Sequence, residues 1–307
     1  MEIIKNGLVF SNDIDLIMQG KNSLGFKYEE NGLIVPNKNF IEDLRDDFKK
    51  ESIKAYEEEV TIVSEEEMSY YMNKFINKYI GYFPIVSMDE IYVDCDNKYV
   101  FSLDCTRMTG QKKLVSRLNP LDVNGVSNQV ERLAKIFKRC DANEIFLVDD
   151  VVFSGSVISQ IRDLFLEEDI NVIGVLSAIS SEEAYDRFNK EMKYGLECGY
   201  LMKKGVTDEI CERDFYFGIA QSGMSKIVNG KVYKAPYFLP FGDPVARASV
   251  PEKKAESFSK SCVNRSLMLM SEIEKNSNKI ILMKDLPEPI LNTKEDDEVV
   301  KVLRKVR

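Results

Sequence analysis

Residues 144–158, with the sequence EIFLVDDVVFSGSVI, constrain the fold of this chain more than any other stretch. Four consecutive apolar residues, 145–148, predict a strand covered on both faces, which is typical of a central strand in a parallel sheet. Two acids and a Ser-Gly-Ser turn follow, and then Ile158, Ile161 and Phe165 have helical spacing. The stretch therefore predicts a strand, a loop and a helix in an α/β fold.

The two acids, Asp149 and Asp150, are expected where ligands of open α/β sheets bind, beyond the carboxyl ends of the strands. A turn of Ser154, Gly155 and Ser156 can direct backbone N–H groups and hydroxyls at an anion, and the helix after it adds the positive end of its dipole. Carboxylates repel a phosphate unless they accept hydrogen bonds from neutral hydroxyls or hold Mg²⁺ through water. The pattern therefore favours a ribose 5-phosphate as the ligand.

This stretch resembles the phosphoribosyl pyrophosphate (PRPP) signature of type I phosphoribosyltransferases, in which four apolar residues, two acids and two apolar residues precede a loop rich in hydroxyls and glycine. The resemblance implies that Asp149 and Asp150 hold the ribose 2- and 3-hydroxyls as the catalytic acids and contact Mg²⁺. It also implies that the loop holds the 5-phosphate. The substrate-binding residues it implies here are Val152, Phe153, Ser154, Gly155, Ser156 and Val157.

Two positions differ from the family pattern. Phe153 replaces a residue that is usually small, and Val157 stands where a threonine normally adds a hydroxyl to the phosphate site. Backbone donors remain available at both positions. The same stretch, without any ligand, is also compatible with a buried strand, an acidic turn and a serine-capped helix of another doubly wound protein.

The resemblance also implies loops that contact pyrophosphate and close over the reaction. The candidates for this role are Lys112, Lys113, Ser116 and Arg117, which follow the turn at residues 109–110. The charge pattern alone favours the simpler interpretation that these cations are exposed on a loop.

Strands and helices alternate around the motif, which predicts a right-handed parallel sheet with helices on both faces. The expected helices after residue 125 span 126–139, 156–167 and 182–193, and the expected strands span 171–178 and 196–202. Ser180 and Glu183 have the spacing of a capping box. Before the motif, strands 90–94 and 99–103 are expected to form a hairpin that turns at residues 96–97.

The remaining elements are predicted from periodicity and from capping residues. Strands are expected at residues 7–10, 32–35 and 279–283, with a polar tail after the last of them. Helices are expected at residues 13–19, from residue 37 onward, at 64–80 with a Ser64–Glu67 capping box, and after Pro251.

Three regions follow from these elements. Residues 1–85 form a mostly helical N-terminal region, residues 86–205 the phosphoribosyltransferase-like α/β core, and residues 206–307 a C-terminal cap. The resemblance gives the cap the role of a hood that selects the acceptor. Its aromatic residues, Phe215, Tyr216, Phe217, Tyr237, Phe238 and Phe241, either stack on a base or pack the cap against the core, and packing is the favoured interpretation for each of them.

Composition excludes several classes of protein. A hydrophobic content of 44% suits a globular chain, and no apolar run is long enough to span a membrane, so a cytoplasmic protein is expected. Histidine is absent, which excludes Ser-His-Asp and Cys-His catalysis within the chain. The six cysteines are scattered, without metal-knuckle spacing. A net charge of -9 argues against broad nucleic-acid binding, although a local basic strip is not excluded.

The sequence leaves three functions open. The first is a Mg²⁺-dependent transferase that moves the phosphoribosyl group of PRPP to a nitrogenous acceptor. The second is a sensor or regulatory module of the same fold that binds PRPP or a nucleotide without turnover, and the third is a nucleotide hydrolase whose acidic pair holds the metal. The acceptor and the oligomeric state, including a homo-oligomer, are left open by the sequence.

Overall fold

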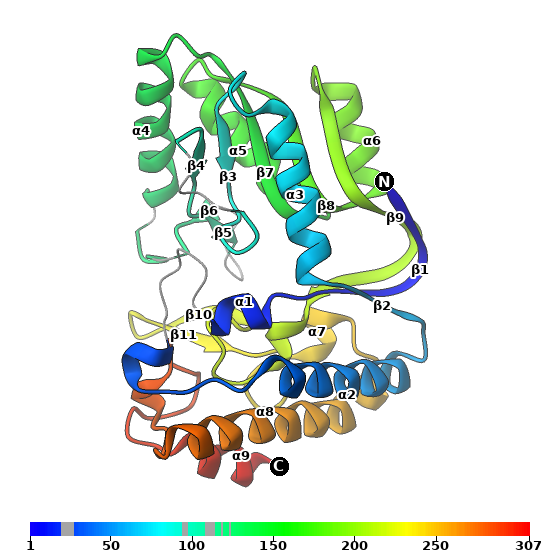
Figure 1. Ribbon diagram of the computed structural model, residues 1–307, viewed down its shortest axis with the longest axis vertical. Helices are drawn as coiled ribbons and strands as arrows, with labels where there is room; N and C mark the ends of the chain where they lie inside the picture. The colour runs from blue at the N-terminus through cyan, green and yellow to red at the C-terminus, as the bar shows by residue number, and fades with distance from the viewer. Residues whose placement is uncertain (20–27, 94–97, 108–113, 118, 123) are drawn as a thin grey trace. The chain divides into compact units, whose positions relative to one another are not determined.

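The computed structural model describes residues 1–19, 28–93, 98–107, 114–117, 119–122 and 124–307 (Figure 1). The described residues form two compact units. Unit 1 contains Met1–Asn6 and Ser64–Val206, and unit 2 contains residues 7–19 and 28–63 together with Thr207–Arg307. Strands β1 (Glu2–Ser11) and β9 (Gly195–Cys211) each run from one unit into the other. The units are therefore interleaved along the chain.

The main sheet has seven strands within the described residues, in the order β2-β1-β9-β8-β7-β3-β4. The strands not yet given are β2 (Val60–Val63), β3 (Ile85–Ser87), β4 (Val100–Ser102), β7 (Glu144–Val152) and β8 (Asn171–Ser181). Neighbouring strands run parallel wherever the register is defined. The predicted α/β class with a parallel sheet is therefore confirmed.

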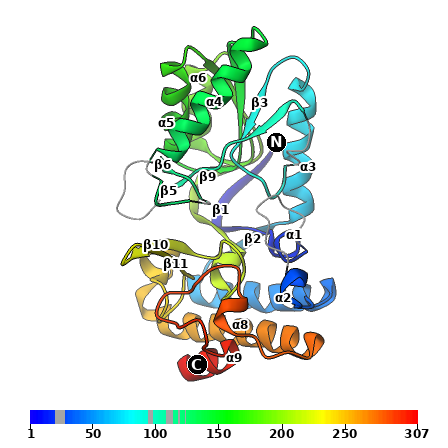
Figure 2. The same ribbon diagram turned by 90° about the vertical axis from the view of Figure 1, so that its left-hand side faces the viewer.

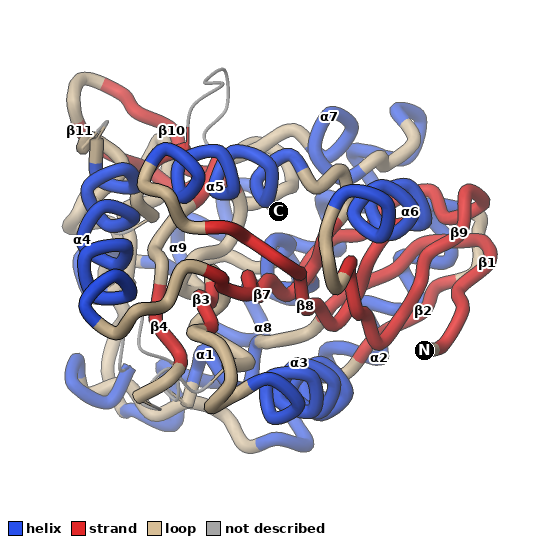
Figure 3. The backbone as a smooth tube through the Cα atoms, turned by 90° about the horizontal axis from the view of Figure 1, so that it is seen from above, coloured by secondary structure: helices blue, strands red, loops and turns tan. Residues whose placement is uncertain are grey.

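Helices cover both faces of the sheet in unit 1. Helix α3 (Glu65–Tyr79) lies on one side of β7 and β8, whereas α5 (Ser156–Glu167) and α6 (Glu182–Glu191) lie on the other (Figure 3). The side chains of alternate β7 residues pack against the helices on opposite faces of the sheet. Phe146 stacks on Tyr79 of α3 with ring centroids 4.1 Å apart, while Ile145 and Leu147 join the apolar cluster of α5, α6 and α4 (Gly125–Arg139). Burial on both faces thus accounts for the unbroken apolar run of β7.

Unit 2 is built on helices α2 (Lys38–Tyr56) and α8 (Ala255–Ser277), which lie side by side in Figures 1 and 2. Phe10, Phe48, Phe215 and Phe258 pack together in its core. The other elements of this unit are α1 (Ile14–Met18), α7 (Pro244–Ala248), α9 (Val299–Val306), the hairpin of β10 (Met224–Val228) and β11 (Lys231–Ala235), and 3-10 turns at Tyr28–Asn31, Glu212–Phe215, Glu252–Lys254 and Met283–Asp285. A small antiparallel pair, β5 (Thr106–Arg107) and β6 (Leu114–Val115), belongs to unit 1.

The predicted hairpin at residues 90–103 is wrong. Residues 91–93 are bends, and β4 pairs in parallel with β3, as Ile85 opposite Val100 shows. Pairing with β3 attaches residues 100–102 to the main sheet, because β3 pairs with β7 on its other side, and Val100 is buried there. The expected turn at residues 96–97 lies outside the described residues.

Three further expectations are corrected. Strand β8 runs on to Ser181, so the side chain of Ser181 caps α6, and Ser180 instead donates to the carbonyl of Val152. Residues 32–35 form no strand, and the N–H of Ile34 donates to Ser277 Oγ of α8. Residues 279–283 hold only an isolated bridge at Leu282, and the tail ends in α9, whose apolar side is buried.

Several predictions made from capping and periodicity are confirmed. The Ser64–Glu67 capping box opens α3, and helices 126–139 and 156–167 match α4 and α5 within one residue. The aromatic residues of the C-terminal region are mostly core, since Phe215, Phe217 and Phe238 are fully buried. Among the described helices, none has both the length and the apolar composition needed to cross a bilayer.

Candidate functional site

The two acids of the motif lie in the second half of β7. The strand continues to Val152, and Asp149 is opposite Ser177 of β8 in the parallel register. Asp150 accepts a hydrogen bond from the N–H of Val151 at 2.8 Å, and both aspartates are half-buried. Val152 itself is a core residue, so only its backbone can face a ligand.

Two more acids follow neighbouring strands of the same sheet. Asp89 comes two residues after β3 and Asp104 two residues after β4, and both are buried. Because the carboxyl ends of parallel strands meet at one edge of a sheet, β7, β3 and β4 bring their acids to the same edge. The sequence analysis missed both residues. The signal was available in PIVSMD and VFSLD, where a short apolar run precedes an aspartate as in the main motif.

Arg117 brings a cation to this edge. Its backbone N–H donates to Asp104 Oδ1 at 2.9 Å, and Ser116 donates its hydroxyl to the same carboxylate. The guanidinium Nη2 donates to the carbonyl of Cys105 at 3.2 Å. Asp104 therefore fixes the loop from which Arg117 projects. Lys112 and Lys113, the other two expected cations, lie outside the described residues.

Burial dominates the electrostatics of this edge, because it is the largest cause of the raised pKa of Asp89, Asp149 and Asp150. Burial, and then the charge of Asp150, raises the pKa of Asp89 from 3.8 to about 7. Burial, Asp150 and Asp89 raise the pKa of Asp149, and burial raises the pKa of Asp150. The positive charge of Arg117 lowers all three pKa values but does not offset these effects. The edge is therefore suited to a ligand that brings neutral hydroxyls or positive charge.

The donor set fits Mg²⁺ held together with a ligand. Among the described residues, no group of three or more cysteine and acidic side chains is arranged to enclose a metal ion. Mg²⁺ is commonly bound through one or two carboxylates, with water and substrate oxygens as the remaining ligands. Asp149 and Asp150, whose pKa values are raised chiefly by burial, supply two such carboxylates.

The loop after β7 turns at a glycine in the left-handed conformation. Gly155 adopts a φ of +62° and immediately precedes α5. Ser156 donates its N–H to Ser154 Oγ at 3.4 Å, and the two serine hydroxyls are 3.2 Å apart. Phe153 is 45% exposed, and its carbonyl accepts the hydroxyl of Ser181 at 2.6 Å. Val157 packs against the core cluster, so its side chain does not replace the missing hydroxyl.

Gly155 is expected to be intolerant of a side chain. A Cβ there would lie 2.4 Å from Arg187 Nη2 and 2.6 Å from the ring of Phe188, in addition to the left-handed strain. We expect Gly155→Ala to lower the free energy of unfolding by about 2–3 kcal/mol, measured by urea denaturation. Gly81→Ala is the matched control, because Gly81 has a φ of +86° with nothing within 4 Å of its Cβ position, and should cost only about 1 kcal/mol. Equal losses would contradict the tight contact.

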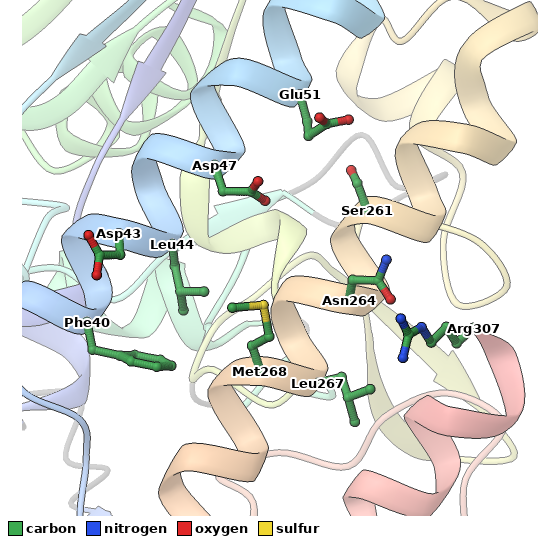
Figure 4. A pocket seen from close by; sticks show the side chains of 10 residues that line it. All are labelled: Phe40, Asp43, Leu44, Asp47, Glu51, Ser261, Asn264, Leu267, Met268 and Arg307. Carbon is green, nitrogen blue, oxygen red and sulfur yellow. The ribbon is translucent and has the colours of Figure 1, made fainter.

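Two hollows of comparable volume, among those formed by the described residues, lie outside the loop. One, of about 590 Å³, is lined by Asp104, Ser116 and the start of α4, and so adjoins the acidic edge within unit 1. The other, of about 620 Å³, lies in unit 2 between α2 and α8 (Figure 4). Of its three acids, Asp47 and Glu51 already contact Arg265 and Lys54, respectively. The first hollow is therefore the one whose lining shares a residue with the acidic edge.

No protein-family model matches the sequence, and no curated protein matches it.

Proposed function

We propose that this chain is a phosphoribosyltransferase-like enzyme that binds PRPP with Mg²⁺ and transfers the phosphoribosyl group to a nitrogenous acceptor. One observation carries the proposal: two adjacent acids near the carboxyl end of a central parallel strand are followed by a left-handed glycine turn at the start of a helix. An acid pair suits vicinal hydroxyls, and a helix start suits a phosphate. On this proposal unit 1 contains a phosphoribosyltransferase-like core, and residues 206–307 serve as its hood.

The proposed roles follow from charge and position. Asp149 and Asp150 accept hydrogen bonds from the ribose 2- and 3-hydroxyls, which keeps C1 of the sugar aligned, and they would hold the Mg²⁺ that accompanies the substrate. The loop at residues 154–157 binds the 5-phosphate. The acceptor nitrogen forms a bond to C1 as the bond from C1 to pyrophosphate breaks, and Arg117 stabilises the departing negative charge. Neither aspartate needs to transfer a proton.

The test is pyrophosphate release from PRPP with Mg²⁺ across a panel of nitrogenous bases. The wild type should release pyrophosphate with at least one base, and Asp149→Asn/Asp150→Asn should be slower by on the order of a hundredfold or more. Asp169→Asn is the control, since the side chain of Asp169 is 92% exposed and its ion pair with Lys138 Nζ is a long 3.7 Å. A wild type no faster than the double variant would remove the proposal.

A second function, nucleotide binding without turnover, is favoured by a specific observation. The side chain of Val157 is turned to the core, and Phe153 is exposed at the loop, so the phosphate site lacks one hydroxyl and carries a bulky ring. Calorimetry with nucleoside monophosphates and Mg²⁺ separates this function from the first. Tight binding without pyrophosphate release would favour a sensor, whereas release of free base without an acceptor would favour hydrolysis.

A further inference from the structure

The guanidinium of Arg187, from helix α6, lies against the phosphate loop of unit 1. Its Nη2 occupies the open side of Gly155, 2.4 Å from where a Cβ would stand. The same nitrogen donates to Ser159 Oγ at 3.4 Å, and the Ser159 hydroxyl donates to the carbonyl of Gly155 at 3.2 Å. Arg187, Ser159 and Gly155 thus form a connected chain at the first turn of α5.

The guanidinium of Arg187 has few partners for its N–H groups and its charge. Its plane lies over the ring of Phe188, with Cζ 4.3 Å from the ring centroid, which fixes its position. Nε is buried and has no hydrogen-bond acceptor among the described residues. No carboxylate of the described residues forms an ion pair with Arg187. By contrast, Arg162 of α5 forms an ion pair with Glu191 at 2.6 Å. The positive charge of Arg187 is therefore not neutralised by a neighbouring acid.

The loop itself has no cation. Residues 153–157 are Phe, Ser, Gly, Ser and Val, so only backbone N–H groups, two hydroxyls and the helix dipole face an anion there. A helix start supplies roughly half an elementary charge, but a phosphate monoester carries close to two negative charges. The carboxylates on the same strand add repulsion. A charge deficit therefore exists at the place where the 5-phosphate is proposed to bind.

We propose that Arg187 is the cation of this phosphoryl subsite and supplies the binding that the hydroxyl absent at Val157 would have given. The inference rests on the proposed function of the site and adds a binding residue to it from a different helix. The guanidinium lies beside the loop at Gly155. It would therefore attract a phosphate bound there, either by donating a charge-assisted hydrogen bond to it or by its positive charge acting across the loop.

The test is calorimetry of ribose 5-phosphate with Mg²⁺ on the full chain. Arg187→Met should bind about ten- to a hundredfold more weakly than the wild type, as expected when a charged hydrogen-bond partner is lost. Its affinity should also depend less on salt. Arg187→Lys should recover most of the loss because it keeps the charge. Arg162→Met is the matched control, with an affinity within about twofold of the wild type, because its partner is a surface acid.

The outcomes separate this inference from the proposed function. If Arg187→Met binds as well as the wild type while Asp149→Asn/Asp150→Asn loses binding, Arg187 has no phosphoryl role and the proposed function stands. If Arg187→Lys is as weak as Arg187→Met and both unfold at lower urea, the residue is structural and the inference is wrong. If the wild type itself does not bind ribose 5-phosphate, both the inference and the proposed function are overturned.

Discussion

Asp89→Asn is expected to be more stable than the wild type at pH 7, by on the order of 2–4 kcal/mol. Asp89 is only 3% exposed, and burial together with Asp150 raises its pKa from 3.8 to about 7. Below its unfolded pKa such an acid is neutral in both states and costs no stability. The cost develops as the pH rises from the unfolded pKa, 3.8, through the folded pKa, about 7, because the unfolded state then ionises more readily than the folded state. Asparagine stays neutral and keeps the Oδ1 that accepts the N–H of Tyr92 at 2.8 Å.

The measurement is urea unfolding of both proteins from about pH 5 to about pH 8. The difference in the free energy of unfolding should grow with pH in favour of Asp89→Asn. Asp122→Asn, which retains the local acceptor for the N–H of Asn124, should show little difference at any pH. A variant that is less stable than the wild type throughout this range would contradict the prediction. It would show that neighbouring groups stabilise the ionised form of Asp89 in the folded protein.

Arg45→Met is expected to cost about 3–5 kcal/mol of unfolding free energy, the largest loss predicted for this chain. In unit 2, Arg45 Nε contacts Glu212 Oε2 at 3.1 Å and Nη2 contacts Asp15 Oδ2 at 3.4 Å. The side chain of Glu212 is 0% exposed and that of Asp15 is 5% exposed, so the variant leaves two buried carboxylates without this cation. Burial already raises the pKa of Glu212, with Arg45 opposing it.

Urea unfolding near neutral pH measures this loss. Arg162→Met removes a surface pair with Glu191 and should cost less than about 1 kcal/mol, which makes it the control. The loss in Arg45→Met should also shrink at acidic pH, because the released carboxyls then become protonated. Similar small losses in the two variants would contradict the view that Arg45 neutralises a buried acidic pair.

The parts of the fold that were predictable are those with strong local periodicity. The run 145–148 and the spacing of Ile158, Ile161 and Phe165 predicted β7 and α5, because the buried faces of both elements appear as apolar patterns in their own sequences. The sequence of a strand does not show which other strand it pairs with. Residues 99–103 were identified as a strand, but nothing near them indicates that the partner is β3 in parallel.

In the candidate site, too, the residues of one local pattern were predictable, and those brought together by the fold were not. Asp149, Asp150 and the Ser-Gly-Ser turn were found from one contiguous stretch. Asp89 was not, although a short apolar run precedes it, because its place beside Asp149 depends on the sheet order. Arg187 was not, because it reaches the loop only through the packing of α6 beside α5. Val152 and Val157 were expected at the ligand, but the sequence motif does not record that their side chains are turned into the core.

The central claim is that the acids of β7 hold a sugar while the turn before α5 holds its phosphoryl group. A crystal structure with PRPP and Mg²⁺ tests it most directly. The account predicts that the ribose 2- and 3-hydroxyls lie within hydrogen-bond distance of Asp149 and Asp150, with the 5-phosphate on the backbone N–H groups of residues 154–157. A sugar bound elsewhere, with these carboxylates making no contact to it, would contradict the account.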